Sequence, residues 1–152
     1  MTKKIKTSIS TSKFISSFKK LMGEGANEFV INVNPVPASR PRVTKWGTYY
    51  GKNYERFRRD VRNEIHSHKG KKLFGPIIAL VEIICPRPKT IERLFPRGDV
   101  DNFAKGPLDC LTSQGSFWGD DDQIVLLEVV KRFVEDNEQP KIIITYKEMT
   151  KV

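Results

Sequence analysis

Residues 76–86 read PIIALVEIICP, an apolar run that has a proline at each end. A short, continuous apolar run of this kind predicts a β-strand that is buried on both of its faces. We therefore expect a sheet that contains this strand, with other elements packed against it.

Three further segments have the residue pattern of strands. EFVINVN (28–34) places Phe29, Ile31 and Val33 on one face, which predicts a half-buried first strand. Residues 122–134 and 140–149 are β-rich runs around the polar EDNEQ, and they predict a closing hairpin. The stretch VTKWGTYYG (43–51) has aromatic residues around a glycine and predicts a second, smaller hairpin.

Two segments have helical patterns. Residues 53–70 repeat apolar side chains at spacings of three and four, which predicts an amphipathic helix that Asn53 caps. Residues 99–115 also have helical character, but Gly106 and Pro107 predict a kink there, or a split into a short turn and a longer helix. The fold class expected from these elements is α/β (α+β), a mixed β-sheet with two main helices packed on it.

The N-terminal residues 1–22 are basic, rich in serine and threonine, and free of acids. Phe14, Phe18 and Leu21 fall at helical spacing, so a short amphipathic helix is one interpretation. A solvated basic arm that becomes ordered on a partner is the other, and it is the one we favour. Residues 1–27 are thus expected to be an extension and residues 28–152 the folded domain.

The 152 residues include 27 Lys and Arg against 18 Asp and Glu, a net charge of +9. This excess points to nucleic acid or another anionic surface as the partner. No apolar run approaches the roughly 20 residues that a membrane-spanning helix needs, so no membrane association is expected. Cys85 and Cys110 lack metal-binding spacing and predict buried free thiols, which favours a cytoplasmic location.

Basic and aromatic residues alternate between residues 39 and 60, where seven Lys or Arg accompany two acids. Guanidinium groups bind phosphates, and aromatic faces stack on exposed bases. Aromatic residues on the apolar face of the helix are expected to be core instead. The residues that we expect to contact DNA are Arg40, Arg42, Lys45, Trp46, Arg58 and Arg59.

Acidic residues gather in RGDVDNFAKGPLDCL (97–111). If the segment is extended, Asp99 and Asp101 point to the same side and can share a divalent cation. If DNFAK is a helical turn, Lys105 lies on the same face as Asp101, where it can stabilise negative charge on a phosphate. A second acidic cluster, FWGDDDQI (117–124), can supply a further ligand.

Each of these acids also has an ordinary structural interpretation. Asp99 or Asp101 can cap the following helix, Asp109 can be a solvated helix residue, and the three aspartates 120–122 can be a plain turn. Their coincidence in a strongly basic chain favours a functional site over these separate explanations.

The pattern D-V-D-N-F-A-K-x-x-x-D-x-L, followed by F-W-x-D-D-x-Q-I, resembles the RusA family of Holliday junction resolvases. The resemblance is specific over residues 99–124 and looser over 28–146. It implies a RusA-like homodimer that nicks four-way DNA junctions symmetrically and depends on Mg²⁺, for which Mn²⁺ can substitute. Its site residues are carried over to Asp99, Asp101, Lys105 and Asp121, with Asp120 as an additional metal ligand and Asp109 as a structural acid.

Two rival functions fit the same residues: a less selective metal nuclease that acts on branched DNA, and a basic DNA-binding module without catalysis. The three consecutive aspartates also leave open which of Asp120, Asp121 and Asp122 is the ligand.

Overall fold

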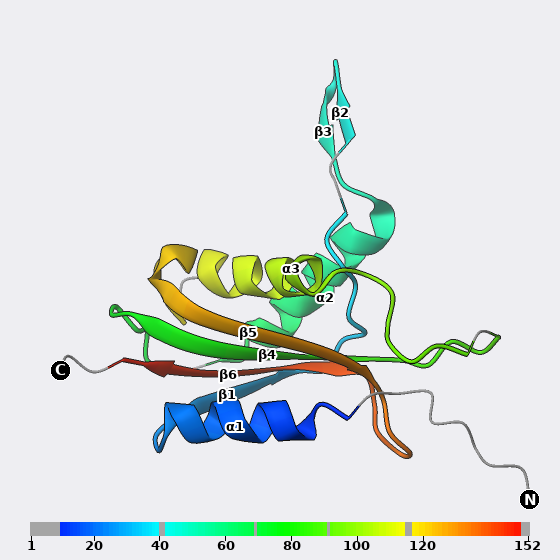
Figure 1. Cartoon of the computed structure of the whole chain (residues 1–152). Coiled ribbons are helices and arrows are strands. Elements are labelled where there is room, and N and C mark those ends of the chain that lie inside the picture. The colour runs from blue at the N-terminus through cyan, green and yellow to red at the C-terminus, as the bar shows by residue number, and fades with distance from the viewer. Residues whose placement is uncertain (1–9, 40–41, 69, 91, 115–116, 150–152) are drawn as a thin grey trace, which may run out of the picture.

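The computed structural model describes residues 10–39, 42–68, 70–90, 92–114 and 117–149. Its main sheet has four strands in the order β1-β6-β4-β5 (Figure 1). Strand β4 pairs in parallel with β5 and antiparallel with β6, so the predicted mixed sheet is confirmed. The strands are β1 (Asn27–Ile31), β4 (Ile77–Cys85), β5 (Ile124–Phe133) and β6 (Lys141–Glu148).

The predicted closing hairpin is wrong, because β4 lies between β5 and β6 and pairs with both. The two strands are antiparallel to each other, as a hairpin requires, but their backbone hydrogen bonds go to β4. The buried apolar run of residues 77–85 is more stable in this central position than at an edge of the sheet. An edge strand leaves the backbone N–H and C=O groups along one side unpaired.

Two helices cover one face of the sheet, α2 (Lys52–Ile65) and α3 (Val100–Ser113). The residue at the N-cap of α2 is Gly51, so the prediction that Asn53 caps this helix is wrong. Helix α3 is continuous through Pro107, so the predicted split into two helical pieces is wrong, whereas the alternative of a kink stays a prediction. The two helices pack closely at Gly106, where an added Cβ would lie 3.1 Å from Phe57 Cε1 and 3.1 Å from the Tyr54 hydroxyl.

A third helix, α1 (Ser12–Met22), covers the opposite face of the sheet (Figure 1). Phe18 and Met22 are buried against Leu80 of β4, and the ammonium of Lys147 on β6 donates to the Met22 carbonyl at 2.9 Å. This segment is therefore the amphipathic helix and not the solvated arm that we favoured. The apolar residues at positions 14–22 were a correct signal, which the high content of lysine, serine and threonine obscured.

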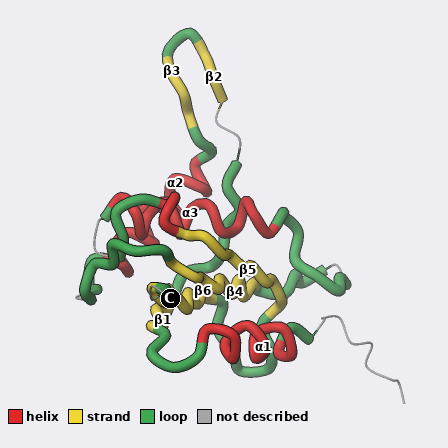
Figure 2. The backbone as a smooth tube through the Cα atoms, turned by 60° about the vertical axis from the view of Figure 1, so that its left-hand side comes forward, coloured by secondary structure: helices red, strands yellow, loops and turns green. Residues whose placement is uncertain are grey.

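The small hairpin is present as β2 (Arg42–Thr44) and β3 (Gly47–Tyr49). It projects away from the sheet and the helices (Figures 1 and 2). Gly47 has a φ of 127°, a conformation that side chains rarely allow, so glycine is needed at this turn. At the tip, Trp46 is 78% exposed.

Both cysteines are buried and free, as predicted, and burial raises the pKa of the Cys85 thiol to about 11. Over the described parts of the chain, none of the helices is long and apolar enough to span a membrane.

Candidate active site

The acidic site is built on α3 and on the loop that leads into it. Asp99 has an extended backbone at the N-cap position, and Val100 begins the helix. The prediction that Asp99 and Asp101 share an extended segment therefore fails at Asp101, which lies in the first helical turn. In the described structure the Asp99 side chain makes no capping hydrogen bond, so the capping interpretation is not supported either.

The loop before Asp99 is held in place by a cation from the sheet. Lys131 of β5 donates from its ammonium to the Pro96 carbonyl at 2.7 Å and to the Gly98 carbonyl at 2.6 Å. Gly98 has a φ of 104°, and an added Cβ would lie 2.8 Å from the Phe103 ring. These contacts fix the point at which the chain enters α3, and hence the position of Asp99.

Helix α3 carries Asp101, Lys105 and Asp109 at intervals of four residues, so the three lie along one face. The predicted helical stacking of Lys105 on Asp101 is thus confirmed by the backbone. Eight residues of helix rise by about 12 Å, so Asp101 and Asp109 are too far apart along the axis to bind one ion together.

The three consecutive aspartates have three different environments. Asp120 caps a single 3₁₀ turn (Asp121–Gln123): one of its carboxylate oxygens accepts from the Asp122 backbone N–H at 2.9 Å. Gln123 completes this capping box and ties the turn to the Leu73 and Gly75 carbonyls. Asp122 is exposed.

Asp121 is the member of the triplet whose carboxylate contacts α3. Its Oδ1 accepts a hydrogen bond from the Thr112 hydroxyl, and its carboxylate also lies against that of Asp109. The turn that Asp120 caps therefore decides which of the three aspartates faces the helix.

Asp109 and Asp121 form a pair of carboxylates in contact. Burial raises the pKa of Asp109, and the hydrogen bond and the like charge of Asp121 raise it further. Lys105 of α3 and Arg58 of α2 are close enough to lower that pKa, so two cations flank the pair. Asp109, which we interpreted as structural, thus lies inside the acidic site. Its spacing of four from Lys105 and eight from Asp101 was the sequence signal for this.

Arg58 is half-buried between the two helices and the base of the hairpin. Its guanidinium lies 5.5 Å from the Tyr50 ring centre and 5.8 Å from that of Tyr54. Its Nε is buried and has no hydrogen-bond partner among the described residues. An Arg held by two aromatic rings beside a carboxylate pair is well placed to bind a phosphate that enters the site.

Within the described residues, no group of three or more His, Cys, Asp or Glu side chains lies close enough to hold a metal ion. Asp99, Asp101 and Asp121 are therefore not brought together as three ligands of one ion, and their joint role remains a prediction. Mg²⁺ in proteins is commonly bound through one or two carboxylates, with water and substrate phosphate completing its coordination. The Asp109–Asp121 pair fits that requirement.

The structure describes only some of the residues that we predicted to contact DNA. The backbone N–H of Ala38 donates to the Asn102 carbonyl of α3 at 2.8 Å, so the proline-rich segment passes the start of this helix. Arg40 lies outside the described residues, and Arg42 is placed only by its backbone in β2. The Lys45 ammonium lies 5.1 Å from the ring centre of Trp46 at the hairpin tip.

An open groove of about 510 Å³ runs along the basic side of α2. It joins Arg58 to the exposed Arg59, both of which we predicted to bind DNA. The residues that line it are Lys52, Glu55, Arg56, Arg58, Arg59 and Arg62.

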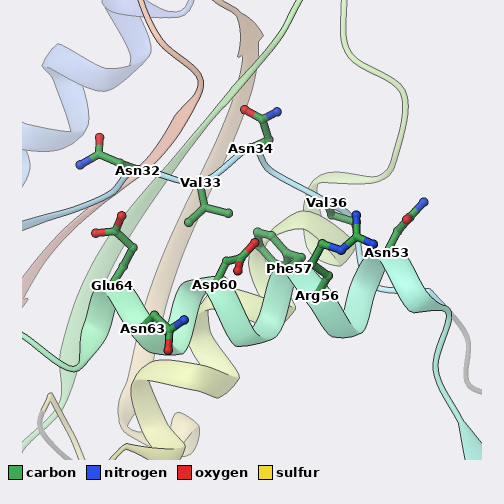
Figure 3. A pocket seen from close by; sticks show the side chains of 10 residues that line it. All are labelled: Asn32, Val33, Asn34, Val36, Asn53, Arg56, Phe57, Asp60, Asn63 and Glu64. Atoms are coloured by element: carbon green, nitrogen blue, oxygen red, sulfur yellow. The ribbon is translucent and has the colours of Figure 1, made fainter.

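A larger pocket, about 870 Å³, lies between α2 and the segment that follows β1 (Figure 3). Asparagine side chains from both segments surround it, together with Asp60 and Glu64. It contains no residue that we predicted to be catalytic or to bind metal.

The chain was compared with families of known proteins. The family model described as endodeoxyribonuclease RusA matches residues 32–147, which is more than two thirds of the chain. This range includes α3, the three consecutive aspartates and the hairpin. No curated protein gives a significant match to the chain.

Proposed function

Because the chain belongs to the RusA family of endodeoxyribonucleases, we propose that it is a Mg²⁺-dependent enzyme that resolves four-way DNA junctions by paired, symmetric nicks. The observation that carries this proposal is the Asp109–Asp121 pair, flanked by Lys105 and Arg58 in a chain of net charge +9. Contact between two carboxylates is unfavourable unless a cation or a proton is shared, and a divalent cation satisfies both.

The residues that would hold Mg²⁺ are the aspartates of α3 and of the 3₁₀ turn. Asp121 and Asp109 lie at one end of the acidic face, and Asp99 and Asp101 at the other. A bound Mg²⁺ supplies charge stabilisation and lowers the pKa of a coordinated water. Asp120 gives one oxygen to the cap, so we propose a weaker role for it than for Asp121.

Lys105 and Arg58 contribute positive charge at the scissile phosphate. Lys105 lies on the acidic face of α3, which supports a role for its ammonium in stabilising the charge that develops as the phosphodiester is attacked. Arg58 approaches the same face from α2, where its planar guanidinium can bind two phosphate oxygens.

DNA would bind along the basic side of α2 and against the projecting hairpin. Phosphates would contact Arg59 and the other cations of the groove, together with Arg40, Arg42 and Lys45. Trp46 at the tip would stack on a base that the crossover leaves exposed. Selectivity for a junction would then depend on its shape more than on base sequence.

A homodimer would account for paired nicks, because two sites related by a two-fold axis match the near two-fold symmetry of a junction.

The test is a cleavage assay with a four-way junction and a linear duplex of the same sequence, with and without Mg²⁺. We expect symmetric nicks in the junction that require Mg²⁺ or Mn²⁺ and that Asp101→Asn abolishes. Undiminished cleavage by that variant would disprove the assignment of Asp101 to the metal site. Equal cutting of the linear duplex would support the unselective nuclease, and junction binding without cleavage in either metal would support the binding module.

A further inference from the structure

We propose that Thr112 and Trp118 are positioning residues that hold the carboxylate of Asp121 in the orientation needed to bind a divalent cation. This inference rests on the proposed function, because it concerns the same acidic site. It assigns a role to Thr112, which lies at a position that the quoted motif leaves open, and to Trp118, which belongs to the motif but was given no role.

The geometry is a short chain of hydrogen bonds. Trp118 Nε1 donates to Thr112 Oγ1 at 2.8 Å, and the Thr112 hydroxyl donates to Asp121 Oδ1. An indole N–H can only donate and an ionised carboxylate can only accept, whereas a hydroxyl does both. The direction of the chain is therefore fixed: the indole occupies an acceptor site on the hydroxyl oxygen, and the single hydroxyl proton points to Asp121.

Trp118 is a rigid starting point for this chain. Its side chain is fully buried, and its ring packs edge-on against Tyr146 at 5.6 Å between ring centres. Its backbone is also held, by a bridge to Leu73. Thr112 lies in the last turn of α3, where its hydroxyl would otherwise bond to a carbonyl of the preceding turn. The indole and the carboxylate together keep it turned outward.

This arrangement acts against the repulsion between Asp109 and Asp121. When both carboxylates are charged, their repulsion favours a rotation of the Asp121 side chain away from the helix. A hydrogen bond to the charged carboxylate is among the stronger ones in proteins, so Thr112 can hold one Asp121 oxygen in place. The other oxygen is then available to a cation. Partners of this kind, one step removed from a metal, commonly change metal affinity 10–100-fold when mutated.

Two substitutions of Thr112 separate the hydroxyl from the volume of the side chain. Thr112→Val keeps the shape and removes the hydroxyl, whereas Thr112→Ser keeps the hydroxyl. Mn²⁺ is the probe, because it is paramagnetic and broadens the NMR signals of nearby protons. The chain has two tryptophans, so its ¹⁵N spectrum contains two indole signals, and Trp46→Phe identifies which belongs to Trp118.

In the wild-type protein we expect Mn²⁺ to broaden the Trp118 indole signal, with a midpoint that Thr112→Val raises about tenfold and Thr112→Ser restores to within about twofold. Thr112→Val should also shift that signal without Mn²⁺, because the indole loses its acceptor. Thermal unfolding of both variants establishes that they are folded. Asp121→Asn serves as the reference for a lost ligand.

Two results would overturn the proposal: a Thr112→Val midpoint equal to that of the wild type, or no Mn²⁺ broadening of the Trp118 signal in the wild type. Neither result depends on cleavage. If Mn²⁺ binds as expected but no junction is cut, the proposed function fails while the positioning role stands.

Discussion

Asp121 and Asp122 are neighbours in sequence with different surroundings, and this difference decides their roles. The carboxylate of Asp121 touches Asp109 and Thr112, whereas that of Asp122 is exposed. The difference arises from the 3₁₀ turn. Its capping box fixes the backbone conformation, and this decides which of the two side chains faces α3. The same substitution at Asp122 can therefore serve as the control for a substitution at Asp121.

Asp121→Asn should reduce Mg²⁺-dependent junction cleavage by at least about a hundredfold, because it removes a charged ligand where charge stabilisation is needed. Asp122→Asn should leave the rate within about twofold of the wild type, since its backbone N–H still bonds to Asp120. Single-turnover cleavage at saturating protein measures both. The reverse order of the two effects would assign the ligand to Asp122.

His68 gives a second prediction at this scale, because its surroundings differ from those of His66. His66 is exposed at the end of α2, but the His68 ring stacks on Phe117 with 3.8 Å between ring centres. Burial lowers the pKa of His68, so the folded protein resists taking up the proton. The unfolded chain, with a pKa of about 6.5, takes it up first, and stability falls as the pH drops below that value.

Urea unfolding at pH 7.5 and 5.5 tests this. The midpoint should decrease on acidification in the wild type, and His68→Phe, which keeps the stacking, should reduce that decrease. His66→Gln is the control and should leave the decrease unchanged.

At the scale of elements, the site depends on the close packing of α2 against α3. This packing brings Arg58 of α2 to the acidic face of α3. Gly106 makes this approach possible, since any Cβ there would press on Tyr54 and Phe57. Neither aromatic ring can move easily, because both are buried in the core. The same contact explains why α3 stays continuous at Pro107: packing along its length outweighs the hydrogen bond that proline cannot make.

Gly106→Ala should destabilise the protein by about 1–3 kcal/mol, the usual cost of overpacking a core. The sign is informative, because Gly→Ala inside a helix with free space stabilises by about 0.5–1 kcal/mol. Ser113→Ala, at an exposed position of the same helix, is the control, and chemical denaturation measures both. A stabilised Gly106→Ala variant would mean that α2 and α3 leave room for a methyl group at this position.

The hairpin gives another prediction for a single element. Trp46→Ala should weaken binding to a four-way junction by about tenfold or more, since stacking contributes about 1–3 kcal/mol per base. Its unfolding temperature should be unchanged, because the side chain is 78% exposed. Val43→Ala, also exposed on the hairpin, should have little effect on affinity in the same titration. Equal losses in the two variants would argue against stacking.

The elements themselves could be predicted well from local patterns, and their arrangement less well. The residues of β4, β5 and β6 were identified by their apolar runs. Their order in the sheet depends on which strand is stabilised most by having a neighbour on each side. A local sequence pattern does not report the relative stability of alternative strand orders. Similarly, the motif pointed to the aspartates, but Arg58 and Thr112 joined the site only when α2 and the 3₁₀ turn were packed against α3.

For the whole molecule, the two faces of the sheet have different tasks. One face carries α2 and α3, and with them the acidic site and the basic groove, while the hairpin projects beyond α2 (Figures 1 and 2). The other face is covered by α1. The proposed acidic site and the basic groove therefore share one side of the sheet.

Junction binding should consequently weaken steeply with salt. If about six cations each contact a phosphate, affinity should fall by roughly a thousandfold between 50 and 200 mM salt. Titrations of the junction with protein at several K⁺ concentrations measure the slope of log affinity against log salt. Ca²⁺ replaces Mg²⁺ in these titrations so that the junction is not cleaved. Arg59→Gln should make the slope shallower by about one unit, whereas Lys13→Gln, on α1, should not change it.

Helix α1 has a practical consequence for anyone who shortens this chain. The family match begins at residue 32, which makes a start near β1 look like a natural boundary. A chain cut there would lose Lys19, which lies 4.0 Å from the buried carboxylate of Glu82, and would leave Leu80 facing water. Burial already raises the pKa of Glu82. Such a fragment would expose an apolar face of the sheet and should precipitate during purification, although every proposed catalytic residue would still be present.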